Sequence, residues 1–165
     1  MKFNGITVIL ATALLCLGAG RAGAQTEGGL LYGVERLDMF VMPLDADSET
    51  CGVTETKIKA TVGKAVAEIG APLSLDGRDY VLFVRLSSLP KGGDCFSSID
   101  LGVHWEGSVP LPGYPDGSRA KVKLWENGTI VISSRRDHWL EVAGILEHLA
   151  RGLASAWRAD NGGAG

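Results

Sequence analysis

Residues 95–107 read CFSSIDLGVHWEG, and the character of their side chains alternates along the run. A period of two predicts a strand with one buried face and one polar face. The predicted buried face carries Cys95, Ser97, Ile99, Leu101, Val103 and Trp105. Residues 51–70, CGVTETKIKATVGKAVAEIG, instead repeat apolar side chains at helical spacing, which predicts a helix over 54–69. Both stretches begin with a cysteine, so a Cys51–Cys95 bond would join the start of the helix to the start of the strand.

The N-terminus has the pattern of a secretory signal. One basic residue, Lys2, precedes the apolar run ITVILATALLCL at residues 6–17, and small residues follow as far as Ala24. The run is shorter than the roughly 20 apolar residues that span a bilayer. Cleavage after Ala24 is therefore expected, a retained membrane anchor is the weaker alternative, and Cys16 would leave with the signal.

Removal of residues 1–24 from the 165-residue chain leaves 141 residues, the size of one domain. The net charge moves from −3 to −5, because Lys2 and Arg21 are removed and no acidic residue is. An acidic chain without a long basic run is a poor ligand for nucleic acid or anionic lipid.

The two cysteines that remain favour a structural disulfide in an exported chain. Closure of the loop between Cys51 and Cys95 predicts about 4 kcal/mol of stabilisation. A redox-active or metal-binding pair is the alternative, but such pairs use a much closer spacing.

The first half of the chain predicts a βαβ unit. Residues 30–42, most clearly 37–42, and the apolar run YVLFVRL at 80–86 have the composition of strands, with the helix between them. A crossover of this kind makes the two strands parallel.

The second half of the chain predicts a hairpin and a helix. Asn127-Gly128 lies between two β-prone runs, residues 121–126 and 129–133, and this dipeptide is the strongest short hairpin signal. Apolar residues then recur at helical spacing over about 137–158, before a flexible tail at 161–165.

These elements assemble into a single α+β domain at residues 25–160, in the order β-α-β-β-β-β-α. We expect a mixed, mostly antiparallel sheet of about five strands, two amphipathic helices on one face and one disulfide. Residues 109–118 are rich in Pro and Gly and are predicted as a loop between the third strand and the hairpin.

The best candidate for chemistry is His104. Asp100, His104 and Glu106 share the polar face of their strand, where a carboxylate near an imidazole could orient a general base or contribute to a metal site. At the usual strand rise, however, Asp100 is about 13 Å and Glu106 about 6–7 Å from His104. A solvated polar stripe explains the same residues, so this site is the alternative and not the main prediction.

Other catalytic signals are weaker. His138 and His148 point about 80° apart on the predicted helix and cannot share a metal ion. The sequence has no Gly-x-Ser-x-Gly elbow and no Gly-rich phosphate loop. No catalytic residue, metal or cofactor is therefore predicted, and an enzyme is the minority interpretation.

Recognition surfaces are the stronger prediction. The 109–118 segment would present Leu111, Tyr114 and Pro115 on a rigid scaffold, although an ordinary long connection explains it too. The strand at residues 39–42 could bind by strand addition if it lies at a sheet edge, with burial in the core as the alternative.

Two functions from different classes remain. The first is an exported, non-catalytic module that binds another envelope or secreted protein, or an envelope component, with the periplasm as the expected location and secretion as the alternative. The second is a small exported hydrolase or metal-binding protein that uses Asp100, His104 and Glu106. No nucleic-acid partner and no membrane span after processing are expected.

Overall fold

The computed structural model describes residues 29–67, 80–111 and 114–162, and it confirms an α+β fold. The elements are β1 (Asp38–Val41), α1 (Ala46–Thr50), α2 (Glu55–Ala67), β2 (Tyr80–Lys91), β3 (Asp94–Leu111), β4 (Tyr114–Ser134) and α3 (His138–Asn161). The described residues form one sheet of four strands, one fewer than expected, in the order β1-β2-β3-β4. β1 is parallel to β2, as the βαβ unit predicts, and the other neighbours are antiparallel.

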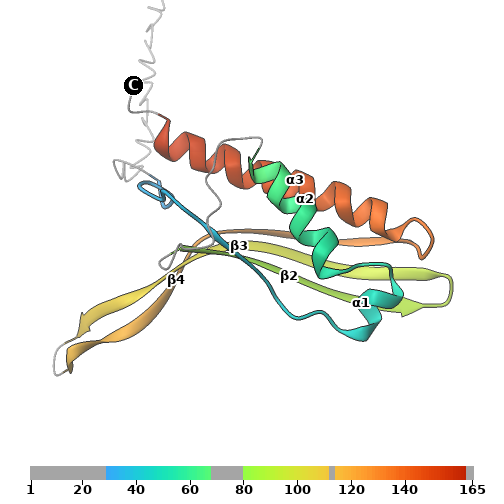
Figure 1. Ribbon diagram of the computed structural model, residues 1–165, viewed down its shortest axis with the longest axis horizontal. Coiled ribbons are helices and arrows are strands. Elements are labelled where there is room, and N and C mark those ends of the chain that lie inside the picture. The colour runs from blue at the N-terminus through green and yellow to red at the C-terminus, as the bar shows by residue number, and fades with distance from the viewer. Residues whose placement is uncertain (1–28, 68–79, 112–113, 163–165) are drawn as a thin grey trace, which may run out of the picture.

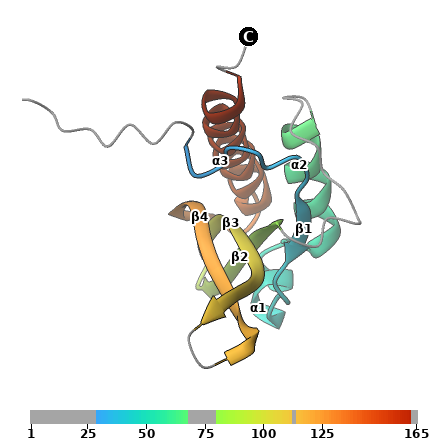
Figure 2. The same cartoon turned by 90° about the vertical axis from the view of Figure 1, so that its left-hand side faces the viewer.

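Both longer helices, α2 and α3, lie over one face of the sheet (Figures 1 and 2). Between Cys95 and Val103, the odd-numbered residues of β3 point toward these helices, and Ile99, Leu101 and Val103 are fully buried. The helices contribute matching apolar stripes, and their buried members are Ile58, Val62, Ala65, Val66, Val142, Leu146, Leu149, Ala150, Leu153 and Ala154. Among the described residues, no helix has the length and the apolar run needed to cross a bilayer.

The predicted disulfide is present, with Cys51 Sγ bonded to Cys95 Sγ at 2.05 Å. Both cysteines are fully buried. Cys51 is the C-cap of α1, a short helix that is not among the elements predicted from the sequence. This helix forms because Asp45 caps it, accepting a hydrogen bond from the Ser48 backbone N–H at 2.7 Å. Hydrogen bonding by Ser48 lowers the pKa of the Asp45 carboxyl.

The C-terminal end of α3 binds the segment that precedes β1. Trp157 Nε1 donates to the Val34 carbonyl at 2.7 Å, and Asp160 Oδ2 accepts from the Leu31 backbone N–H at 2.9 Å. Asn161 Nδ2 donates to the Leu31 carbonyl at 2.9 Å, and its Oδ1 accepts from the Gly33 N–H. The helix therefore continues through Asn161, three residues beyond the predicted end, and residues 163–165 of the predicted tail lie outside the described part.

The predicted hairpin at Asn127-Gly128 is wrong, because β4 runs through both residues without a turn. Gly128 is paired with Asp100 on β3, and its φ is not positive. A Cβ at Gly128 would lie 2.7 Å from the Ile99 carbonyl oxygen and would overlap the Asp100 carboxylate. The glycine thus allows a close approach between β3 and β4 instead of making a type I′ turn.

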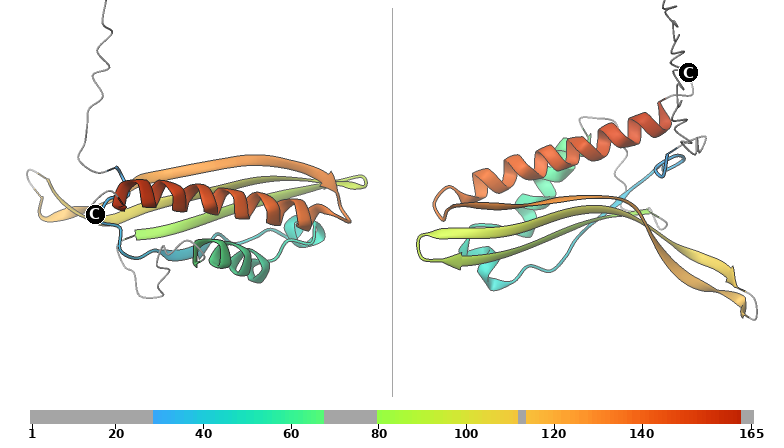
Figure 3. Two further views of the ribbon diagram at one scale, coloured as in Figure 1. Left: turned by 90° about the horizontal axis from the view of Figure 1, so that it is seen from above. Right: turned by 180° about the vertical axis from the view of Figure 1, so that it is seen from behind.

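The prediction of a loop at 109–118 is also wrong over most of its length. Val109 pairs with Ser118 and Leu111 with Tyr114, so the end of β3 and the start of β4 form a two-stranded extension. We call residues 107–111 and 114–120 the arm. Its connecting residues 112–113 lie outside the described part. The arm extends past the helices and bends toward the sheet face that they leave uncovered (Figure 3).

Two glycine substitutions test the space that the structure gives to glycines in α3 and between β3 and β4. Gly144 lies in α3, and a Cβ added to it would have nothing within 4 Å, so Gly144→Ala is expected to raise the free energy of unfolding by about 0.5–1 kcal/mol. Gly128→Ala is expected to lower it by about 1–3 kcal/mol, since the Ile99 backbone cannot move away easily. Urea denaturation of both variants checks this, and a stabilising Gly128→Ala would contradict the close approach.

Candidate functional site

Among the described residues, α2 and α3 both lie on one face of the sheet, and we call the opposite face the open face. The odd residues of β2 and the even residues of β3 point to it, and register places Leu89, Phe96 and Ile132 side by side across three strands. Leu89 is 57% exposed, Ile132 60% and its neighbour Ile130 70%. Contiguous exposed apolar patches are common at protein–protein interaction sites.

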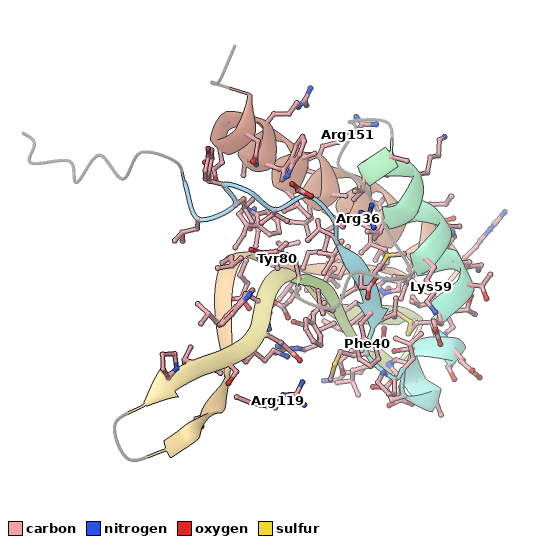
Figure 4. All side chains as sticks on the ribbon, turned by 60° about the vertical axis from the view of Figure 1, so that its left-hand side comes forward. Arg36, Phe40, Lys59, Tyr80, Arg119 and Arg151 are labelled. Atoms are coloured by element: carbon pink, nitrogen blue, oxygen red, sulfur yellow. A yellow bond between two sulfur atoms is a disulfide. The ribbon has the colours of Figure 1, made fainter. Side chains whose placement is uncertain are left out.

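The open face also has a pocket of about 430 Å³ near the base of the arm. Its described lining comes from β1, β2 and β3, and consists of Asp38, Met39, Phe40, Val81, Phe83 and Glu106. Figure 4 labels Phe40 and Arg119 on the side of the sheet away from α3. The pocket therefore opens on the same face as the apolar patch.

Phe83 is the centre of the pocket's side-chain contacts. The Phe40 ring meets it edge-on at 5.6 Å between centroids, and the His104 ring lies at 4.8 Å. Lys121 Nζ lies 3.6 Å from the centroid of the Phe83 ring and 3.1 Å from Glu106 Oε1. The site is thus an aromatic surface with a cation and a carboxylate beside it.

His104 is held against Phe83 because Gly102, the cross-strand partner of Phe83, has no side chain to keep it away. A Cβ at Gly102 would lie 3.3 Å from His104 Nε2. Burial, and then the positive charges of Lys121 and Lys123, lower the pKa of His104. Its Nδ1 is buried and has no hydrogen-bond partner among the described residues. A neutral imidazole is therefore favoured at pH 7.

Asp100, His104 and Glu106 share the open face, as the alternation predicts, but each has separate surroundings. Asp100 leans over Gly128, Glu106 contacts Lys121, and His104 contacts Phe83. In the described part of the chain, no three His, Cys, Asp or Glu side chains are grouped so that they could hold a metal ion.

The predicted recognition residues lie at the end of the arm. Leu111 is the last residue of β3 and pairs with Tyr114, the first residue of β4, which Pro115 follows. The backbone of these three residues is what the structure describes, and it places them at the tip of an extended hairpin and not in a separate loop.

The structure also has a buried polar network that sequence reasoning missed. His138, fully buried at the start of α3, contacts Ser97 Oγ through Nε2 and Ser133 Oγ through Nδ1, each at 2.7 Å. Ser97 Oγ lies 2.7 Å from Ser88 Oγ. The sequence signal for this network was Ser97 on the predicted buried face of β3, since a buried hydroxyl needs a hydrogen-bond partner. Because Ser88, Ser97 and His138 are at most 5% exposed, this network has a structural role.

Sequence reasoning also missed Phe40, Phe83 and Lys121 as parts of one site. The available signal was Arg85, which shares a face of β2 with Phe83 and indicates that this face meets solvent. The pairing of β1 with β2 and of β3 with β4 then brings the other members beside Phe83.

No protein-family model matches the chain, and no curated protein matches it. One solved structure that it resembles is a minor lipoprotein from Acinetobacter baumannii, with a TM-score of 0.45 and 12% sequence identity, covering 78% of this chain and 93% of that one. A likeness at this level carries no functional argument.

Proposed function

We propose that this protein is an exported, non-catalytic module that binds another protein of the cell envelope on its open face. The observation that carries the proposal is the apolar patch of Leu89, Ile130 and Ile132, which is exposed on a sheet whose other face is covered by helices. Large exposed patches are uncommon on soluble domains without a partner. The arm bends toward the same face and would add to the contact (Figure 3).

Export is supported by two independent features. The N-terminal 24 residues have the pattern of a secretory signal. The buried Cys51–Cys95 disulfide is typical of proteins that fold in an oxidising compartment. In a bacterial cell, the periplasm is the location that suits both features and a partner in the envelope.

Site-specific photo-cross-linking tests the proposal with a matched control. Ile130 on the open face and Leu140 on α3 are both 70% exposed, so they differ in location and not in accessibility. A photoreactive amino acid at position 130 is expected to give a discrete cross-linked protein in the native envelope, at several times the yield obtained from position 140. Mass spectrometry would identify the adduct.

Two results would contradict the proposal. Equal yields from positions 130 and 140 would show that the open face has no special contact. No adduct from position 130, in a cell where the protein is exported and its disulfide is formed, would show that this face stays free.

A further inference from the structure

The pocket beside Phe83 combines an aromatic floor with acidic side chains, and this combination suits a positive charge. Phe83 and Phe40 supply the rings, Met39 and Val81 the aliphatic wall, and Glu106 a carboxylate. From this arrangement we infer that the pocket receives a lysine or arginine side chain of the protein bound on the open face. The inference rests on the proposed function and names the chemistry of the partner.

The chain itself shows how a cation binds there. The Lys121 ammonium lies over the Phe83 ring at 3.6 Å and contacts Glu106 at 3.1 Å. An ammonium over an aromatic face is stabilised by the ring quadrupole, and the carboxylate adds an ion pair. A partner's cation would take the same two interactions, with Lys121 as its internal competitor.

Lys121 is a weak competitor because its contacts are exposed. The Lys121 side chain is 46% exposed and that of Glu106 is 35% exposed, and ion pairs at such exposure are worth little. The charged members of the described pocket lining, Asp38 and Glu106, are both acidic. The lowered pKa of His104 keeps that ring neutral near pH 7, so it adds no opposing charge.

A protein side chain fits better than a small hydrated ion. The methylene stem of a lysine or arginine would lie along Met39, Phe40 and Val81 while its charged end reaches Glu106. The pocket opens onto the same face as Leu89 and Ile130, where the rest of the partner would contact the apolar patch.

A pair of peptides tests the charge requirement. The processed protein, purified from an exporting bacterial host, is titrated with acetyl-Leu-Lys-Leu-amide and with the same peptide containing norleucine in place of lysine. The NMR signals of the Phe83 and His104 rings are expected to shift with the lysine peptide, which should bind about two- to fivefold more tightly than the norleucine peptide. Equal binding of the two peptides would overturn the inference.

Two variants of this protein are expected to change its affinity for the lysine peptide in opposite directions. Glu106→Gln should weaken binding of the lysine peptide, whereas Lys121→Met should strengthen it about two- to fivefold by removing the competitor. Lys123→Met is the matched control, since Lys123 lies on the same strand but contacts Glu126 at 2.6 Å instead of Phe83. The inference would be overturned if Lys121→Met bound the lysine peptide more weakly than the wild type. It would also be overturned if Lys123→Met strengthened binding as much as Lys121→Met does. Circular dichroism confirms that each variant is folded.

These outcomes are separate from those of the proposed function. A discrete adduct from position 130 together with no preference for the lysine peptide would support the open face as a binding surface. It would reject only the inference that a lysine or arginine side chain enters the pocket. Absence of the adduct would contradict the proposal that the open face binds a partner.

Discussion

Replacement of both Cys51 and Cys95 by alanine is expected to lower the free energy of unfolding by about 4 kcal/mol. The bond closes a long loop, with the two cysteines 44 residues apart in sequence. Without it the unfolded chain gains conformational entropy, while the folded chain loses the link between α1 and β3. Urea denaturation of the variant and the wild type measures the difference.

Reduction provides the control for this prediction. Dithiothreitol should bring the wild-type protein close to the stability of the double variant and should leave the variant unchanged. A loss below about 1 kcal/mol would mean that the unfolded chain is already restricted near these residues, because the stabilisation comes mainly from that state.

The second large expected effect is a loss of stability below pH 6.5 that comes from His138. Burial lowers the pKa of His138 below its ordinary value of 6.5, because the charged imidazole is poorly solvated inside the domain. Above pH 6.5 the ring is neutral in both states and its full contribution to stability is present. Below pH 6.5 only the unfolded state takes up the proton, so stability should fall by about 1.4 kcal/mol per pH unit until the folded pKa is reached.

Two variants isolate this contribution. His104 also has a lowered pKa and acts with the same sign, so the stability profile between about pH 7.5 and 5.5 is best measured in a His104→Gln background. His138→Gln in that background should remove most of the remaining slope. It should also cost about 1–3 kcal/mol at the upper end of this range, since the hydroxyls of Ser97 and Ser133 lose their imidazole partner. A slope that persists in the double variant would assign the effect to other groups.

Local patterns predicted the elements that bury a regular stripe of side chains. The alternation at 95–107 placed Ile99, Leu101 and Val103 on the buried face of β3, and the helical spacing at 54–69 placed Ile58 and Val62 against the core. These predictions succeeded because burial of one face fixes the period of the sequence. The parallel pairing of β1 with β2 followed from the crossover rule.

The site was predicted only in part. Alternation placed His104 and Glu106 on the uncovered face, but it could not show that Phe83 lies between Phe40 and Lys121. That contact depends on the strand order β1-β2-β3-β4. Strand order is a property of the whole sheet, and no single segment encodes it.

Local periodicity and the spacing of the cysteines were enough to predict the α+β class, the disulfide, the two amphipathic helices and the faces of β3 residues 95–106. The conformation of Asn127-Gly128, in contrast, depends on contacts with β3. The dipeptide favours a turn in isolation, but pairing with β3 on both sides of it stabilises an extended chain, and Asp100 occupies the space beside Gly128. Long-range pairing outweighed a local preference, and it produced the arm and the open face together.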